Sequence, residues 1–128
     1  MPDFKRVFSG SPWEKKIAYC RAVQAGNHIF ISGTAPVSPD GSTFAPGDAY
    51  LQTKKCLQII EKAIGELGAT MRHVVRTRVF VTDISRWQEY GKAHAEFFAD
   101  HPPASSIIGI DALIASDMLV EIEADAVL

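Results

Sequence analysis

The sequence is short of cysteine, and the two cysteines that it has are not spaced as a motif. Cys20 and Cys56 are the only thiols in 128 residues, and they form no CxxC pair. Small secreted domains that depend on disulfide bonds carry more cysteines at closer spacings. We therefore expect a protein of a reducing compartment, in which both thiols serve as small buried apolar side chains.

Excess charge and long apolar runs are also lacking. The formal net charge is −2 and the pI is about 6.0, so the chain has no global basic field to attract nucleic acid. No stretch approaches the length of a membrane span, and residues 1–6 lack the apolar core of a signal peptide. These shortages predict a cytoplasmic protein with no membrane partner, and they argue against a nucleic-acid partner.

Common metal-binding and catalytic motifs are missing as well. His28, His73 and His101 form no HxxxH or HExxH pair, so no metal site is predicted. No GxSxG nucleophile elbow occurs, and the glycines near Ser9 and Gly33 lack the spacing of a dinucleotide- or phosphate-binding loop. Candidate functional residues must therefore be found in less regular patterns.

The residues that are present have the composition of one ordinary globular domain. Hydrophobic residues make up 47% and charged residues 22% of the chain. A chain of 128 residues buries roughly two thirds of its unfolded surface in a single core. We predict one domain over residues 1–128.

Hydrophobic periodicity predicts strands in runs that two amphipathic helices separate. The predicted elements are a hairpin over 18–24 and 29–32, a helix from Asp48 to Gly68, a strand over 75–81, a helix opened by a Ser85–Gln88 capping box and closed by Pro102, and strands over 106–111 and 119–128. This order predicts an α+β fold with both helices on one face of a mixed sheet. The other face would expose apolar side chains such as Phe80, which predicts a homo-oligomer.

The last predicted strand places three acidic side chains on one face. Glu121, Glu123 and Asp125 occupy alternate positions and so point the same way. They can form a solvated edge-strand face, or they can pair with Arg76 and Arg78 across neighbouring strands. In a third interpretation, one carboxyl group lies in a partly dry pocket, where a raised pKa lets it hold a water and pass a proton.

Four further positions in the second half of the chain are candidates for a functional role. His94 shares an apolar helix face with Phe98, which favours a core or interface histidine over a catalytic one. Ser105 and Ser106 form an adjacent pair after a double proline, which allows a serine nucleophile, but the sequence assigns no His/Asp partner to either. Gly91 costs about 1 kcal/mol relative to alanine in mid-helix, so it serves either close backbone packing or an adjacent pocket.

Several short motifs, taken in order, resemble those of a known family. They are Ser11-Pro-Trp-Glu14, Ala18-Tyr-Cys-Arg-Ala-Val23, Asn27-His-Ile-Phe-Ile-Ser-Gly-Thr-Ala-Pro36, Leu51-Gln-Thr53 and the closing Glu121-Ile-Glu-Ala124. The order and spacing of these motifs resemble the Rid family (YjgF/YER057c/UK114), also described as L-PSP endoribonuclease-like. The resemblance extends from about Ser11 to the end of the chain.

The resemblance implies a fold, an assembly and a chemistry. Rid proteins have a chorismate-mutase-like α+β fold and form homotrimers with three clefts between subunits. Typical members hydrolyse reactive enamines and imines to 2-keto acids and ammonia without a cofactor. The resemblance assigns water placement or proton transfer to Glu121. It assigns ligand contacts to Tyr19, Ser32, Gly33, Gly91, Ser105, Ser106 and Ile107.

One position departs from the usual pattern of the family. Typical members have Pro-Ala-Arg-Ser where this chain has Pro-Ala-Ser-Ser, so Ser105 stands in place of an arginine that grips the substrate carboxylate. A serine offers one neutral hydroxyl instead of a charged fork of donors, which costs about 1.5 to 3 kcal/mol of binding. The chain is closer to the arginine-lacking subgroups of the family. Arg21, Arg76 and Arg78 are candidates to replace the missing charge.

Taken together, these observations predict a small-molecule hydrolase or deaminase with an intersubunit cleft. Its ligand would be an imine, an enamine or a related carbonyl metabolite, and the sequence does not name it. Two other functions stay open: a non-catalytic metabolite-binding or protein-stabilising module, and a ribonuclease or translation inhibitor. The charge balance and the absence of a histidine pair disfavour the last of these.

Overall fold

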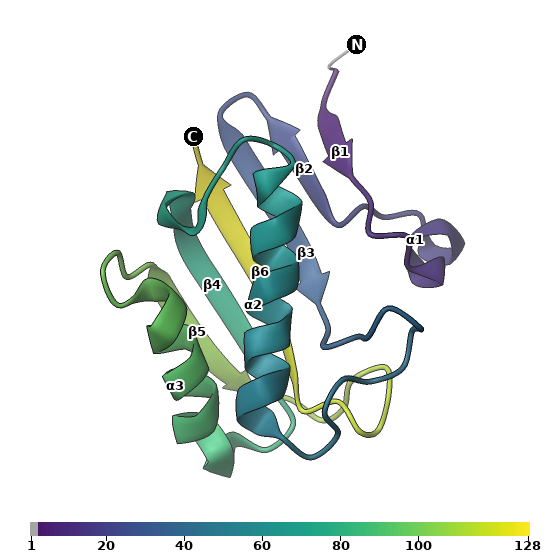
Figure 1. Ribbon diagram of the computed structural model, residues 1–128, viewed down its shortest axis with the longest axis vertical. Coiled ribbons are helices and arrows are strands. Elements are labelled where there is room, and N and C mark those ends of the chain that lie inside the picture. The colour runs from purple at the N-terminus through teal and green to yellow at the C-terminus, as the bar shows by residue number, and fades with distance from the viewer. Residues whose placement is uncertain (1–2) are drawn as a thin grey trace.

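A six-stranded mixed sheet forms the centre of the computed structural model, which describes residues 3–128 (Figure 1). Met1 and Pro2, at the start of the segment predicted to carry no signal peptide, lie outside the described residues. The strands are β1 (Lys5–Val7), β2 (Ala22–Ala25), β3 (His28–Thr34), β4 (Val74–Val81), β5 (Ala104–Gly109) and β6 (Val120–Val127). The helices are α1 (Pro12–Ile17), α2 (Ala49–Gly65) and α3 (Trp87–Phe98), with short 3₁₀ turns η1 (Met71–His73) and η2 (Ile84–Arg86).

The strand order is β1-β2-β3-β6-β4-β5, so the C-terminal strand lies in the middle of the sheet. Neighbouring strands are antiparallel except for β4 and β5, which α3 connects and which are therefore parallel. A register shift interrupts the pairing of β3 with β6 between Ile31 and Thr34. This bulge separates Ser32 and Gly33 from the regular ladder.

Helix α2 begins where the sequence predicts. The Asp48 side chain accepts a hydrogen bond from the backbone N–H of Leu51 at 2.9 Å, which caps the helix. Its apolar stripe, which includes Leu57, Ile60 and Ile64, is fully buried. Burial of this stripe against the sheet holds α2 over β3 and β6.

The predicted capping box at the start of the second long helix is wrong. The Asp83 side chain instead accepts a hydrogen bond from Ser85 N at 3.1 Å, and the turn η2 precedes α3. Asp83 is an equally good capping residue two positions earlier, so the chain turns before Ser85 can cap. Strand β5 also starts at Ala104, two residues before the predicted position.

Helices α2 and α3 pack on the same face of the sheet, which confirms the predicted α+β architecture (Figure 1). The opposite face has no helix among residues 3–128, and it exposes apolar side chains such as Phe30 and Ile108. Strand β1 and helix α1, neither of which was predicted, lie at the edge of the sheet next to β2.

Candidate functional site

The three acidic side chains of β6 share the uncovered face of the sheet. Val120 and Ile122 are fully buried on the helix side, so Glu121 between them points to the opposite face. The predicted pairing across strands is confirmed for two of the acids. Arg78 lies 3.7 Å from Glu123, and its distance from Asp125 is 3.5 Å.

Glu121 differs from its two neighbours. Within residues 3–128 it forms no ion pair, and it is more deeply enclosed than a free surface carboxylate. Burial raises the pKa of the Glu121 carboxyl above its usual range; the positive charge of Arg21 opposes this shift and the negative charge of Glu123 adds to it. A carboxyl group in this environment keeps its proton to higher pH than a free surface carboxyl group does, which suits a group that accepts and returns a proton.

The β3 bulge brings Gly33 against this carboxyl group. A methyl group added at Gly33 would come within 2.7 Å of Glu121 Oε2, closer than side-chain atoms normally approach. The Ser32 hydroxyl is directed away, because it donates a hydrogen bond to Cys20 O at 2.7 Å. Only glycine leaves room for the Glu121 carboxylate in this position.

Arg21 anchors the backbone on the other side of the bulge. Its Nη1 donates hydrogen bonds to Gly33 O at 2.7 Å and to Thr34 Oγ1 at 3.1 Å. Its guanidinium carbon lies 5.5 Å from the centre of the Tyr19 ring. Arg21 is therefore a fixed cation beside Glu121, whereas Arg76 is exposed and Arg78 is only half-buried.

A buried acid balances Arg21. Glu14 of α1 is 4% exposed, and its Oε2 lies 3.6 Å from Arg21 Nε. This separation makes an ion pair without a hydrogen bond, and Arg21 Nε has no hydrogen-bond partner in the part of the chain described. The backbone N–H and hydroxyl of Ser9 donate hydrogen bonds to Glu14. Through this network, the N-terminal segment and α1 are attached to the Glu121 region.

These residues open onto a broad cavity of about 1500 Å³. The residues that line it include Tyr19, Arg21, Ser32, Gly33 and Glu121. Further walls come from α1, the outer face of α2 and the loops before α2 and β6. The structure thus brings together four of the predicted site residues and one of the three arginines considered as a replacement charge.

The other predicted ligand residues lie elsewhere in the chain. Ser105, Ser106 and Ile107 belong to the edge strand β5, and Gly91 belongs to α3; none of these four lines the large cavity. Thr77 of β4 pairs with Ser105, and the two hydroxyl oxygens are 2.7 Å apart. Because Thr77 also lies 2.8 Å from His94 of α3, Ser105 points to the helix side of the sheet, opposite to Glu121.

Gly91 does not serve close packing. A Cβ atom added there would meet no atom within 4 Å, so the packing interpretation is wrong. The surroundings of Gly91 are open in this structure. That finding is consistent with the other interpretation, in which the missing side chain leaves room beside α3.

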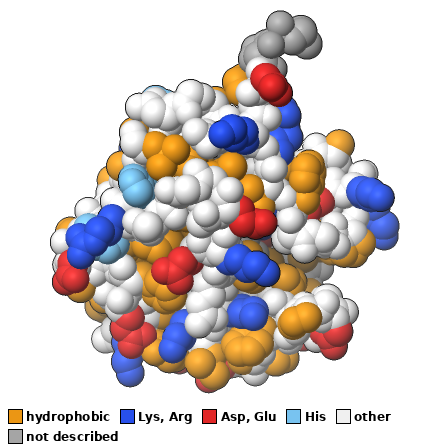
Figure 2. Space-filling model, turned by 45° about the horizontal axis from the view of Figure 1, so that its top comes forward, with side chains coloured by type: hydrophobic (Ala, Val, Ile, Leu, Met, Phe, Trp, Pro, Cys, Tyr) orange, Lys and Arg blue, Asp and Glu red, His pale blue; other side chains and the backbone are white. Residues whose placement is uncertain are grey.

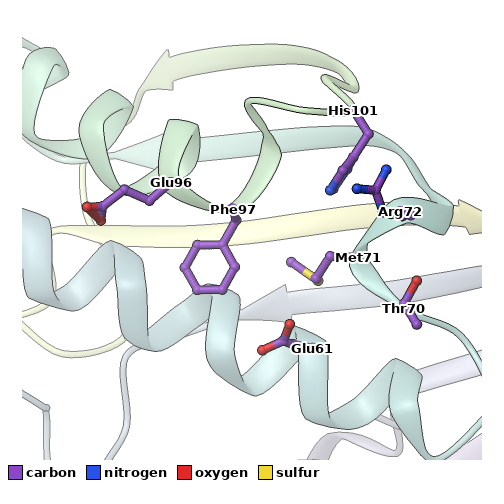
Figure 3. A pocket seen from close by; sticks show the side chains of 7 residues that line it. All are labelled: Glu61, Thr70, Met71, Arg72, Glu96, Phe97 and His101. Carbon is purple, nitrogen blue, oxygen red and sulfur yellow. The ribbon is translucent and has the colours of Figure 1, made fainter.

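A second hollow, which no sequence pattern indicated, lies between α2, the end of α3 and η1 (Figure 3). Its volume is about 390 Å³, and Phe97 projects from α3 into the space above α2. Arg72 and His101 lie at one end and Glu96 at the other, while His101 Nδ1 is buried without a hydrogen-bond partner in residues 3–128. The hollow is shallow and open, and its charged groups are of both signs.

Charges and potential ligands are dispersed over the rest of the molecule. On the face shown in Figure 2, Lys and Arg side chains alternate with Asp and Glu and form no basic stripe. Among the described residues, no group of three or more His, Cys, Asp or Glu side chains is arranged to hold a metal ion. No helix in residues 3–128 is long and apolar enough to cross a membrane. Cys56 is buried, Cys20 is partly buried, and both are free.

Sequence patterns missed the buried Glu14–Arg21 pair because α1 was not expected. One signal was present: Ser11 accepts a hydrogen bond from Trp13 N, and Pro12 follows as the first helical residue. Ser followed by Pro is typical of a helix start. A helix of 6 residues is too short to show apolar periodicity, however.

Comparison with known proteins gives consistent matches over almost the whole chain. A family model described as Endoribonuclease L-PSP matches residues 12–128. A solved structure from Mycobacterium tuberculosis, a member of the YjgF/YER057c/UK114 family, is 44% identical and has a TM-score of 0.88; the match covers 98% of this chain and 100% of that one. The structural match confirms the predicted chorismate-mutase-like α+β fold.

Curated sequences agree with this result. A Streptomyces coelicolor protein is 35% identical over 122 residues, which is 95% of this chain and 90% of that protein. A RutC family protein of Pyrococcus abyssi is 31% identical over 108 residues, which is 84% of each chain.

Proposed function

Because this chain belongs to the Endoribonuclease L-PSP family, which is the YjgF/YER057c/UK114 or Rid family, we propose that it is a small-molecule hydrolase. Its substrate would be an imine, an enamine or a related carbonyl metabolite. Glu121 is the proposed catalytic residue, and Tyr19, Arg21 and Gly33 shape its surroundings.

The placement of the predicted site residues on the sheet carries this proposal. Glu121 and Ser105 point to opposite faces, with β4 between their strands. One protomer therefore offers two half-sites, one at Glu121 and one at the free edge of β5. We propose that a second copy of the chain joins them, so that a cleft between subunits of a homotrimer holds the ligand. The apolar side chains on the uncovered face support such an assembly.

In the proposed reaction, Glu121 acts on water. Its ionised carboxylate accepts a proton from a water molecule, while the water oxygen forms a bond to the imine carbon. The protonated carboxyl group then passes this proton to the nitrogen, which gives a carbinolamine. The carboxylate next accepts the proton of the carbinolamine hydroxyl and passes it to the nitrogen as the carbon–nitrogen bond breaks, which releases ammonia and a ketone. A raised pKa favours the second half of this cycle, because a protonated Glu121 persists to higher pH. Arg21 favours the first half, because its charge stabilises the ionised form.

A specific observation supports a second function, that of a metabolite-binding module without catalysis. Ser105 engages Thr77 and brings no permanent charge to the β5 edge. A substrate carboxylate would therefore lose a charge-assisted contact that is worth about 1.5 to 3 kcal/mol. In this case, the scaffold would bind a less acidic ligand and leave it unchanged.

The test is hydrolysis of 2-iminopropionate, followed by trapping of the remaining imine with semicarbazide. We expect Glu121→Gln to lower the rate by about 100-fold, the contribution typical of a general base. Ser105→Arg should raise the rate for this carboxylate substrate by about tenfold or more. Activity that appears only in Ser105→Arg would favour an intact scaffold with a different natural ligand. Equal rates in the wild type and Glu121→Gln would contradict the proposal.

Two further measurements complete this test. Analytical ultracentrifugation at micromolar concentration should show a trimer, and a single monomeric species would exclude the shared cleft. The family name and the names of several relatives refer to an endoribonuclease, so RNA cleavage is measured on the same preparations. Cleavage that survives stringent purification and disappears in Glu121→Gln would replace imine hydrolysis as the function of this site.

A further inference from the structure

Beneath α3, three side chains form a continuous hydrogen-bonded chain that reaches the exposed edge of the sheet. Thr77 Oγ1 lies 2.8 Å from His94 Nε2 and 2.7 Å from Ser105 Oγ. Thr77 is fully buried, His94 is half-buried and Ser105 is exposed. The chain thus connects an imidazole inside the protein with a hydroxyl group at its surface.

These distances allow two arrangements of the protons. In the arrangement that the structure has, the Thr77 hydroxyl donates to Ser105, and His94 Nε2–H donates to Thr77. In the other, the Ser105 hydroxyl donates to Thr77, and Thr77 donates to an unprotonated His94 Nε2. In this second arrangement, concerted transfer of both protons takes a proton from Ser105 and leaves it on His94.

The surroundings of His94 favour the form that accepts a proton. Burial lowers the pKa of His94 below its ordinary value, so the ring is neutral at neutral pH. Its ring packs against Phe98 with 4.6 Å between centroids, and from β4 it meets the neutral hydroxyl of Thr77. His101, in the loop after α3, lies against Phe98 at 5.9 Å between centroids. No carboxylate or cation contributes to the shift in the pKa of His94.

The edge of β5 also offers hydrogen-bond donors beside Ser105. Ile110 N donates to Val81 O at 2.8 Å, so the N–H group of Ile110 points toward β4, and this determines which residues of β5 direct their N–H groups to β4. Alternate residues therefore point their N–H groups away from β4, and these include Ser105 and Ile107. Within residues 3–128, β5 is the last strand of the sheet, so no strand takes up these groups.

We propose that Ser105 is a nucleophile toward activated acyl groups, with Thr77 and His94 as its proton relay. Ser106 is equally exposed, but strand alternation points it away from His94. Only one of the two adjacent serines therefore has the relay. Within one protomer, Glu121 lies on the opposite face of the sheet and takes no part in the relay.

The step balances within the three side chains and the substrate. Ser105 Oγ forms a bond to the carbonyl carbon of an activated ester, its proton passes to Thr77, and the Thr77 proton passes to His94 Nε2. The bond from the carbonyl carbon to the leaving group then breaks, and the proton held by His94 returns through Thr77 to the leaving group. The outward N–H group of Ser105 donates to the carbonyl oxygen and stabilises the negative charge that develops on it. Water then releases the acyl group by the same sequence of transfers.

The experiment uses a fluorophosphonate probe on the full chain. Ser105 Oγ forms a bond to phosphorus, the phosphorus–fluorine bond breaks, and His94 holds the released proton. Peptide mass spectrometry should locate the adduct at Ser105. The labelling rate should fall as the pH is lowered through the pKa of His94, which lies below 6.5. Absence of an adduct, or an adduct at Ser106 instead, would overturn the proposal.

Variants separate the relay from a merely structural network. We expect Thr77→Val to slow labelling by about 100-fold and Thr77→Ser to restore it. Ser85→Ala is the matched control, because Ser85 is exposed but bonded to the Asp83 carboxylate, and its loss should change nothing. Equal labelling of Thr77→Val and wild type would overturn the relay.

One further variant keeps the outcome clear. If Thr77→Val does not fold, as judged by circular dichroism, His94→Gln replaces it. Labelling of His94→Gln should be slow and should lose the pH dependence seen in wild type and Thr77→Ser, and an unchanged profile would exclude His94. The adduct at Ser105 and the hydrolysis of 2-iminopropionate are measured separately, so failure of the Ser105 site is distinguishable from failure of imine hydrolysis.

Discussion

Around Glu121 the protein encloses charged groups, whereas beneath α3 it encloses neutral hydroxyls and an imidazole. Arg21 and Glu14 are 6% and 4% exposed, and Arg21 connects both to the β3 bulge. Thr77 is just as buried, but its two hydrogen-bond partners are uncharged. A buried ion pair fixes the geometry around it, because loss of either partner leaves an unpaired buried charge and lowers the stability of the fold. A chain of neutral donors and acceptors can transfer a proton along its hydrogen bonds with little change in free energy. The two regions should therefore respond differently to substitution and to pH.

The largest expected effect is the loss of the buried cation. Arg21→Met removes the partner of Glu14 and leaves a carboxylate in a site with almost no access to water. We expect the free energy of unfolding to fall by about 3 to 5 kcal/mol, as it does when one member of a buried ion pair is removed. Urea denaturation at one fixed protein concentration measures this change.

A matched control distinguishes burial from the mere presence of an ion pair. Arg76 lies 3.9 Å from Asp125, but its side chain is 48% exposed, so Arg76→Met should change stability by no more than about 1 kcal/mol. The double variant Glu14→Leu/Arg21→Met should recover part of the loss, because it leaves no unpaired charge. Similar losses in Arg21→Met and Arg76→Met would refute the contrast between buried and exposed charge.

The sequence predicted the long elements well because each has a strong periodic pattern. The alternation in β4 and β6 and the apolar stripe of α2 arise because one face of each element is buried, which produces a periodic pattern of apolar residues in the sequence. Helix α1 and strand β1, with 6 and 3 residues, are too short to show such a pattern. The start of α3 was misplaced because Asp83 and Ser85 are both good caps, and local preference does not choose between them.

For the candidate site, the sequence predicted which face of its own strand a residue occupies, but not the contacts between strands. Alternation placed Glu121 correctly on the face shared with Glu123 and Asp125. The contact of Glu121 with Gly33 depends on a bulge in another strand, and the Thr77–Ser105 contact depends on the register of β4 and β5. Both are set by tertiary packing, so residues far apart in the sequence carry no local sign of them.

A pair of glycines gives the next largest contrast. Gly91 lies in the interior of α3 with nothing within 4 Å of an added Cβ, so Gly91→Ala should raise the free energy of unfolding by about 1 kcal/mol. Gly33→Ala would push its methyl group against Glu121, so it should lower the hydrolysis rate instead. Thermal unfolding and the imine assay measure the two effects. A loss of stability in Gly91→Ala would show that α3 meets a partner at this position.

The smallest expected effects are two pH dependences of opposite sign. Glu121 has a raised pKa in the folded protein, so the fold binds its proton more tightly than the unfolded chain does. Its contribution to stability is fully present below the ordinary pKa of 4.5 and is lost as the pH rises through the raised value. His94 has a lowered pKa, so its contribution is fully present above 6.5 and is lost as the pH falls through the lowered value.

Stability measured by urea denaturation across this range should separate the two groups. Relative to Glu121→Gln, the wild type should lose stability as the pH rises above 4.5, because only the wild type must ionise a half-buried carboxyl group. Relative to His94→Gln, it should lose stability as the pH falls below 6.5, because only the wild type must charge a half-buried imidazole. If both differences changed in the same direction with pH, burial would not be the common cause of the two shifts. Charges brought by a neighbouring subunit would then dominate at one of the two regions, and repeating the measurement below the association concentration would show which.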